Sequence, residues 1–90
     1  ENPRAESNTI DLVTYKVQIA ASKRRLELKS YNFKGLKSLS RVKDGSFYKY
    51  FYSSSTSLIE IRKKKKFARL NGYTNAYIVG FRNGKLFDVD

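Results

Sequence analysis

Apolar and polar side chains alternate strictly in two parts of the chain. In residues 14–21 (TYKVQIAA) one side carries Tyr15, Val17, Ile19 and Ala21, and the other carries Lys16, Gln18 and Ala20. In residues 76–82 (AYIVGFR) the two sides carry Ala76, Ile78 and Gly80 against Tyr77, Val79 and Phe81. Because successive side chains of a strand point to opposite faces, both segments are predicted to be half-buried strands.

Two further strands are predicted around the dipeptide Asp44-Gly45, which is a strong hairpin signal. The strands cover residues 36–43 and 46–53. The second of them carries Phe47, Lys49 and Phe51 on one face and Tyr48, Tyr50 and Tyr52 on the other. Aromatic side chains on both faces indicate that something covers or binds the face that would otherwise be wet. Asn83-Gly84 predicts a type I′ turn, after which residues 85–89 could add a short strand.

One helix is predicted with both of its ends. Thr56 or Ser57 caps its start, the helix runs to about Leu70 or Asn71, and Gly72 takes the position after it. Its inward side carries Leu58, Ile61 and Ala68, with the stem of Lys65 between them, and a second apolar patch carries Ile59, Phe67 and Leu70. The lysine run 63–66 favours a solvated helix face over a phosphate-binding patch.

Residues 22–33 have only a weak helical period, which predicts a short, poorly formed helix or an irregular crossover that ends at Gly35. The element order is then that of an α+β, ferredoxin-like βαββαβ fold, with four antiparallel strands and helices on one face. Residues 1–11 are expected to be a linker or tail, and residues 12–90 the domain. In this topology the first and third strands are neighbours in the centre, and the fourth flanks the first.

The helix-free face of that sheet is the candidate binding site. The residues expected on it are Lys16, Gln18, Phe47, Lys49, Phe51, Tyr77, Val79 and Phe81. A polar side chain among aromatic rings suits a ligand better than a core. Aromatic rings stack on nucleobases, and they also pack against the apolar faces of sugar rings while amide and cationic groups bind hydroxyls and carboxylates.

The amino-acid composition excludes several kinds of functional site. The 90 residues include 19 Lys and Arg but only 8 Asp and Glu, for a net charge of +11, and they include no His or Cys. This excludes a disulfide framework, a zinc finger, a thiol nucleophile and a histidine acid–base pair. The acidic residues lie mostly near the chain ends, so we expect no catalytic site, no metal and no cofactor. No apolar run is long enough to insert into a membrane.

Four segments resemble a SPOR (sporulation-related) domain: TYKVQIAAS, NFKGL, DGSFYKYFYS and GYTNAYIVGFRNGK. The resemblance covers roughly residues 12–85 and is strongest to the C-terminal module of Bacteroidetes N-acetylmuramoyl-L-alanine amidases. The sequence departs from that pattern at Ala20, where relatives usually have Gly, and at Ser22, where they usually have Phe.

The resemblance implies a non-catalytic module that binds peptidoglycan glycan strands stripped of stem peptides. It implies a place in the bacterial periplasm at the division septum, and an upstream enzymatic domain in the same chain. Gln18, Phe47, Lys49 and Tyr77 match the family's binding positions. The alternative is binding of RNA or other single-stranded nucleic acid. It is disfavoured because residues 44–49 (DGSFYK) lack the cation and second glycine of an RNA-recognition strand.

Overall fold

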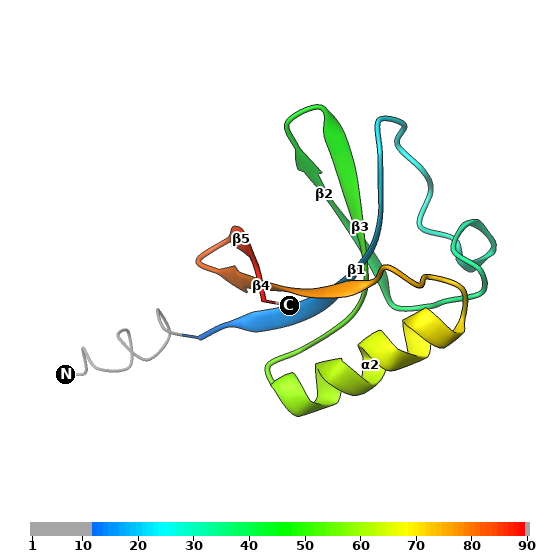
Figure 1. Ribbon diagram of the computed structural model, residues 1–90. Coiled ribbons are helices and arrows are strands. Elements are labelled where there is room, and N and C mark those ends of the chain that lie inside the picture. Colours follow the sequence, from blue (N-terminus) through cyan, green and yellow to red (C-terminus); the bar gives the residue numbers. More distant parts are fainter. Residues whose placement is uncertain (1–11, 90) are drawn as a thin grey trace.

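The computed structural model describes residues 12–89 and has an α+β architecture, as predicted. Five antiparallel strands form one sheet in the order β2-β3-β1-β4-β5, and one α-helix packs on it (Figure 1). The elements are β1 (Thr14–Ser22), a 3-10 turn η1 (Ser30–Asn32), β2 (Leu39–Asp44), β3 (Phe47–Ser55), α2 (Leu58–Leu70), β4 (Tyr77–Arg82) and β5 (Lys85–Asp88).

The strand pairing follows the expected central arrangement, since β1 lies between β3 and β4. The number of strands differs, because residues 85–88 add β5 to the edge of β4. Asn83 and Gly84 both have positive φ (54° and 78°), which is the type I′ turn that Asn-Gly predicts. In the β2–β3 hairpin the turn residues are Gly45 and Ser46, and Gly45 has φ 62°, as the first position of a type II′ turn requires.

The first crossover, residues 23–38, is irregular. Its only helical turn is η1, so the part of the chain that the structure describes has one α-helix where a βαββαβ order has two. Tyr50 of β3 holds the crossover in place. Its hydroxyl accepts a hydrogen bond from the Leu26 amide (2.6 Å) and donates one to the Arg24 carbonyl (3.0 Å), and Phe33 packs on its ring at 5.1 Å. Side-chain contacts from the sheet therefore replace a helix that the weak apolar period does not support.

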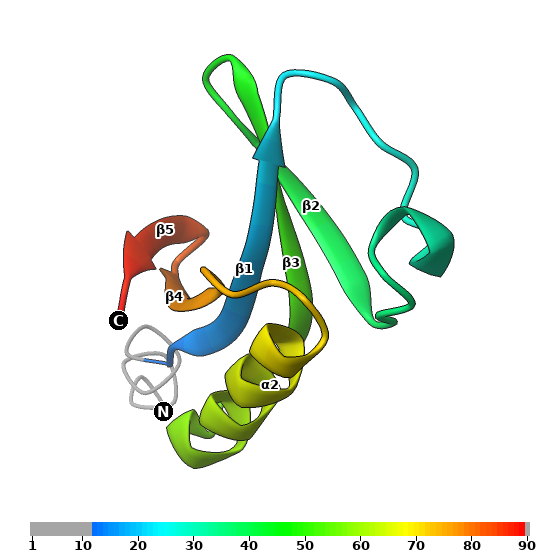
Figure 2. The same ribbon diagram turned by 45° about the vertical axis from the view of Figure 1, so that its right-hand side comes forward.

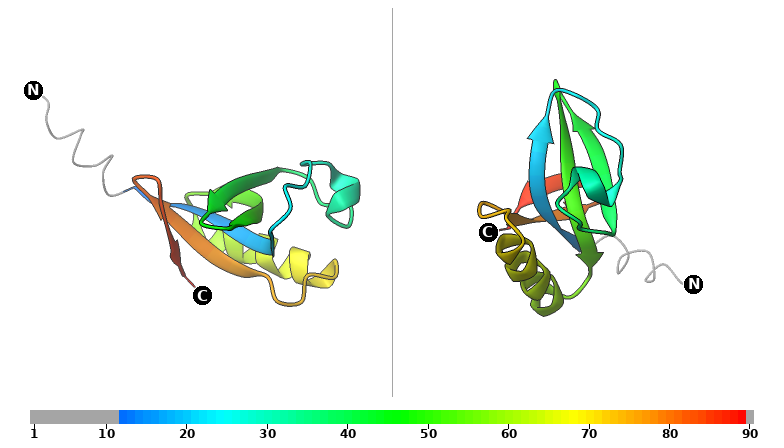
Figure 3. Two further views of the ribbon diagram at one scale, coloured as in Figure 1. Left: turned by 90° about the horizontal axis from the view of Figure 1, so that it is seen from above. Right: turned by 90° about the vertical axis from the view of Figure 1, so that its right-hand side faces the viewer.

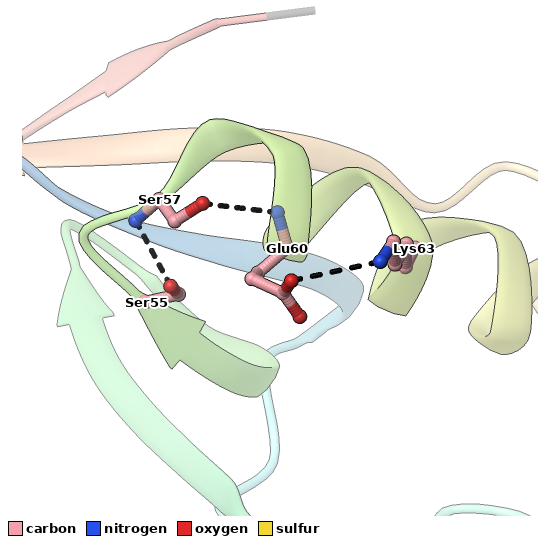
Figure 4. Close-up of polar contacts among 4 residues, drawn as sticks. All are labelled: Ser55, Ser57, Glu60 and Lys63. Atoms are coloured by element: carbon pink, nitrogen blue, oxygen red, sulfur yellow. Dashed lines mark hydrogen bonds and ion pairs between the residues drawn. The ribbon is translucent and has the colours of Figure 1, made fainter.

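The helix α2 begins and ends where the sequence predicts. The Ser57 side chain accepts a hydrogen bond from the Glu60 amide at 3.2 Å, and the Ser57 amide donates to the Ser55 hydroxyl at 2.9 Å (Figure 4). Asn71 is the C-cap, and Gly72 follows it with φ 108°. Such a left-handed residue after a helix is where glycine is favoured, because it lacks a Cβ.

The core lies between α2 and one face of the sheet (Figure 2). Val17, Tyr52 and Ile78 from the sheet meet Ile61 and Ala68 of the helix, and all five are buried. Leu58 and Lys65 are half-buried on the same side of the helix, as predicted. The opposite face of the sheet has no helix against it in residues 12–89, and we call it the helix-free face.

A β-bulge in β1 changes which way the end of the strand faces. Gln18 pairs with Phe51 but Ala20 pairs with Tyr50, so Ile19 is the extra residue. Beyond the bulge Ala20 lies opposite Tyr50 on the helix side, and Ala21 lies opposite Lys49 on the helix-free face. The sides predicted for these two alanines from strict alternation are therefore wrong.

Candidate functional site

The strand registers bring all eight predicted site residues to the helix-free face. Gln18 lies between Phe51 of β3 and Tyr77 of β4, and its chain neighbour Val17 faces the core. The alternation of each strand then places the others. The complete set is Lys16, Gln18, Phe47, Lys49, Phe51, Tyr77, Val79 and Phe81.

These residues do not form the flat, exposed platform that the sequence suggests. Phe51 and Val79 are 0% exposed and Gln18 is 8% exposed, while Phe47 is exposed and the other four are half-buried. Phe51 and Val79 therefore offer no surface to a ligand. The reason is that the sheet is strongly twisted and curls over this face (Figure 3), so other side chains cover it.

At one end of the helix-free face, side chains pack together and leave no room for a ligand. The Lys16 ammonium donates a hydrogen bond to the Ser40 hydroxyl at 3.0 Å, and it lies 5.9 Å and 5.4 Å from the ring centroids of Phe51 and Phe81. The two rings meet edge to face at 5.5 Å. This arrangement combines a cation–π contact with an aromatic pair, and it buries Phe51.

The other end holds a groove of about 580 Å³ between the two hairpins. The β2–β3 hairpin and the β4–β5 hairpin are at opposite edges of the sheet. Because the sheet curls, the two hairpins face each other and form the two walls of the groove. We call this hollow the hairpin groove. Its lining residues are Val42, Lys43, Asp44 and Lys49 on one wall and Gly84, Lys85, Leu86, Phe87 and Asp88 on the other.

The hairpin groove carries both signs of charge. The Lys49 ammonium lies 2.8 Å from a carboxylate oxygen of Asp44. The hydrogen bond to Asp44 raises the pKa of Lys49, against a smaller opposing effect of burial, and the charge of Asp88 adds to the rise. Lys43 and Lys85 also line the groove, but the strand registers put their side chains on the opposite face of the sheet, where the Lys43 ammonium lies 5.7 Å from the Tyr48 ring centroid. The groove thus offers hydrogen-bond donors and acceptors beside the apolar side chains of Val42 and Leu86.

Gln18 is the buried polar residue of this face. Its Oε1 atom is buried and has no hydrogen-bond partner. Along β1 it lies between Lys16 at the closed end and Ala21, which pairs with Lys49 of the groove. An unpaired buried amide oxygen costs roughly 1 to 3 kcal/mol, so a hydrogen-bond donor from a ligand or from water would be stabilising at this position.

Sequence reasoning missed the acidic side of the groove. It assigned Asp44 to a turn and Asp88 to the chain end. Alternation along β2 and β3 could have put Asp44 on the same face as Lys49. Asp44 pairs with Phe47, and Phe47 and Lys49 are two residues apart on β3, so all three side chains point to the same side. The approach of β5 had no local signal, because it depends on the curl of the whole sheet.

Among residues 12–89 no cluster of acidic side chains has the makeup of a metal site. No helix in this described range is long and apolar enough to cross a membrane. The lysine run 63–66 lies on α2, which packs on the face opposite the hairpin groove.

Comparisons of the chain with protein-family models, with curated proteins and with solved structures each found no match. A functional proposal for this protein therefore depends on its own residues and their geometry.

Proposed function

We propose that this chain is a SPOR-like, non-catalytic module that binds peptidoglycan glycan strands stripped of their stem peptides. The binding site is the hairpin groove together with Gln18. In the bacterial periplasm it would direct an attached enzyme, an N-acetylmuramoyl-L-alanine amidase, to the division septum. The single observation that carries the proposal is the buried, unpartnered Oε1 of Gln18 on a helix-free face that also presents a polar groove.

The fold supports this family assignment at the level of strand order. Without β5, the order β2-β3-β1-β4 is the one expected for a ferredoxin-like βαββαβ sheet. We infer that the chain is a variant of that fold, in which η1 replaces the first helix and β5 extends the edge. The hairpin groove is a consequence of this extension, because β5 supplies one of its walls.

The groove suits an amino-sugar polymer. Lys49 would bind a lactyl carboxylate of the glycan, and Asp44 and Asp88 would accept hydrogen bonds from hydroxyl and amide groups. Val42 and Leu86 would pack against sugar ring faces, as apolar walls of ligand sites commonly do. A stem peptide on the lactyl group would remove the free carboxylate and add bulk at the groove.

Nucleic acid suits the site less well, in spite of the net charge of +11. Base stacking needs exposed rings, and Phe51, in the middle of β3, has no exposed surface. Asp44 and Asp88 in the groove would repel phosphates. The experiment that tests the proposal therefore includes RNA.

The test is co-sedimentation with purified sacculi, before and after amidase treatment, beside a filter-binding assay with single-stranded RNA. We expect stronger binding to amidase-treated sacculi, and loss of that binding in Gln18→Leu and in Lys49→Gln. The matched control is Lys63→Glu with Lys64→Glu, which changes the charge on α2. It should leave sacculus binding nearly unchanged at physiological salt, where screening acts within about 8 Å.

Two results would contradict the proposal. One is equal or weaker binding to the treated sacculi. The other is tight RNA binding that falls steeply with salt and is lost in the Lys63→Glu, Lys64→Glu variant, because direct phosphate contacts predict that behaviour.

A further inference from the structure

The helix α2 has a second face that the core does not use. Ile59 is 67% exposed and Leu70 is 77% exposed, although both are large apolar residues. Together with Lys63 and Lys66 they follow the spacing i, i+4, i+7, i+11, which places all four in one row along the helix. We call this row the outer stripe. Phe67, which is 50% exposed, lies beside it.

The outer stripe points away from the sheet. The helix α2 lies against one face of the sheet (Figures 2 and 3). It meets the sheet through Ile61 and Ala68, which are fully buried, and the spacing of the stripe residues places them on the opposite side of the helix. Leu70 and Ile59 are therefore exposed by the geometry of the fold, and they add nothing to the described core.

The charge of α2 is strongly positive. Its 13 residues include six Lys and Arg and one carboxylate, that of Glu60, for a net +5. Glu60 forms an ion pair with Lys63, whose ammonium lies 3.6 Å from a carboxylate oxygen of Glu60. A shallow hollow of about 270 Å³ beside Phe67 is lined by Tyr52, Glu60, Lys63 and Lys64 as well. Lysines thus alternate with the apolar residues Ile59 and Leu70 along the outer stripe.

We propose that the outer stripe of α2 docks on the surface of an anionic lipid bilayer. Complementary charge attracts the helix, since each Lys or Arg close to an anionic surface strengthens binding by about fivefold. Ile59, Leu70 and Phe67 then enter the boundary between headgroups and acyl chains, as the apolar residues of interfacial helices do. The lysine stems extend to the headgroups and keep their ammonium groups hydrated.

A protein partner fits this surface less well. The core of a protein interface is depleted of lysine and forms a contiguous apolar patch. Here Lys63 and Lys66 separate Ile59 from Leu70, so no such patch exists on the stripe. A bilayer surface does not require contiguity, because each apolar side chain can insert separately between lipids.

This orientation has a consequence for the rest of the domain. The outer stripe and the hairpin groove are on opposite sides of the sheet, since α2 packs on one face and the groove opens on the other. A domain that lies on a bilayer through α2 would direct the groove away from the lipid. The two surfaces can therefore be tested separately, and the membrane proposal does not depend on what the groove binds.

The experiment is vesicle co-sedimentation of the 90-residue chain. One set of vesicles contains equal parts of phosphatidylglycerol and phosphatidylcholine, and the other contains phosphatidylcholine alone. We expect binding to the first set only, weakened by salt. Ile59→Ser with Leu70→Ser should abolish it, and Lys63→Gln with Lys66→Gln should weaken it by about 25-fold at low salt.

The matched control is Lys43→Gln with Lys85→Gln, which removes the same charge from the β2–β3 and β4–β5 hairpins instead of from α2. It should bind anionic vesicles with at most a few-fold loss. Thermal melts of all variants should be close to that of the parent chain, because the substituted side chains are exposed. The proposal is overturned if the chain does not bind anionic vesicles, if it binds both vesicle types equally, or if the control loses as much binding as the helix variants.

Discussion

The Lys16 ammonium reaches from β1 across β3 and donates a hydrogen bond to the Ser40 hydroxyl of β2 at 3.0 Å. On the way it lies 5.9 Å from the ring centroid of Phe51, the residue of β3 between them. A cation thus covers an aromatic ring that alternation alone would leave exposed. This contact closes one end of the helix-free face and confines any ligand to the other end, at the hairpin groove.

We expect Lys16→Ala to destabilise the fold by about 1 to 2 kcal/mol, because it removes a hydrogen bond and two cation–π contacts and exposes the Phe51 ring. Urea denaturation measures this change in the free energy of unfolding. Lys64→Ala, on the exposed side of α2, is the matched control and should change it by less than about 0.5 kcal/mol. An equal effect of both variants would show that the contact contributes nothing.

Gln18→Leu should separate stability from binding. Because Gln18 Oε1 is buried without a partner, an apolar side chain of similar size should leave the fold unchanged or stabilise it by about 1 kcal/mol. The same variant should lose binding to amidase-treated sacculi. Thermal melts measure the stability of the variant, and co-sedimentation measures its binding to sacculi. A clear loss of stability would mean that the amide is paired in solution and serves the fold.

Gly80→Ala tests the packing of β5 on β4. A Cβ atom at Gly80 would lie 2.5 Å from Cζ of Phe87, so the ring has to move away. We expect a cost of about 1 to 3 kcal/mol in the free energy of unfolding. In a Phe87→Ala background the same change should cost much less, which a double-mutant cycle measures. If Gly80→Ala destabilised the parent chain and the Phe87→Ala variant equally, the clash with the Phe87 ring would not be the cause.

The Lys49–Asp44 ion pair should lose its contribution at high pH. Folding raises the pKa of Lys49 above its ordinary value of 10.5, chiefly through the hydrogen bond to Asp44. The stability that the pair supplies is therefore complete below that value and is lost as the pH rises through the folded pKa. The effect is within about 1 kcal/mol, because Asp44 is largely exposed.

The measurement compares the parent chain with Asp44→Asn by urea denaturation at about pH 8 and about pH 11.5, on either side of the lysine titration. The difference between the two proteins should shrink at the higher pH. In a Lys49→Gln background the difference should be small at both values, and a pH dependence that persists there would assign it to another group.

The sequence by itself determined the elements whose signals are local. Alternation predicted β1 and β4, and Asn83-Gly84 predicted its turn, because both depend on backbone preferences within a few residues. Ser57 and Gly72 located the ends of α2 because capping satisfies backbone groups one turn away. The sharing of one face by Gln18, Phe51 and Tyr77 followed from the same local periodicity once the strand order was assumed.

Tertiary structure alone decided what that face became. The bulge at Ile19 turns Ala20 and Ala21, and the curl of the sheet brings β5 to the β2–β3 hairpin. The contact that buries Phe51 joins residues 24 apart in the chain. Such features depend on the sum of many long-range contacts, each too weak to impose a pattern on its own segment. For that reason the sequence predicted an exposed aromatic platform, and the folded chain has a groove beside a closed aromatic end.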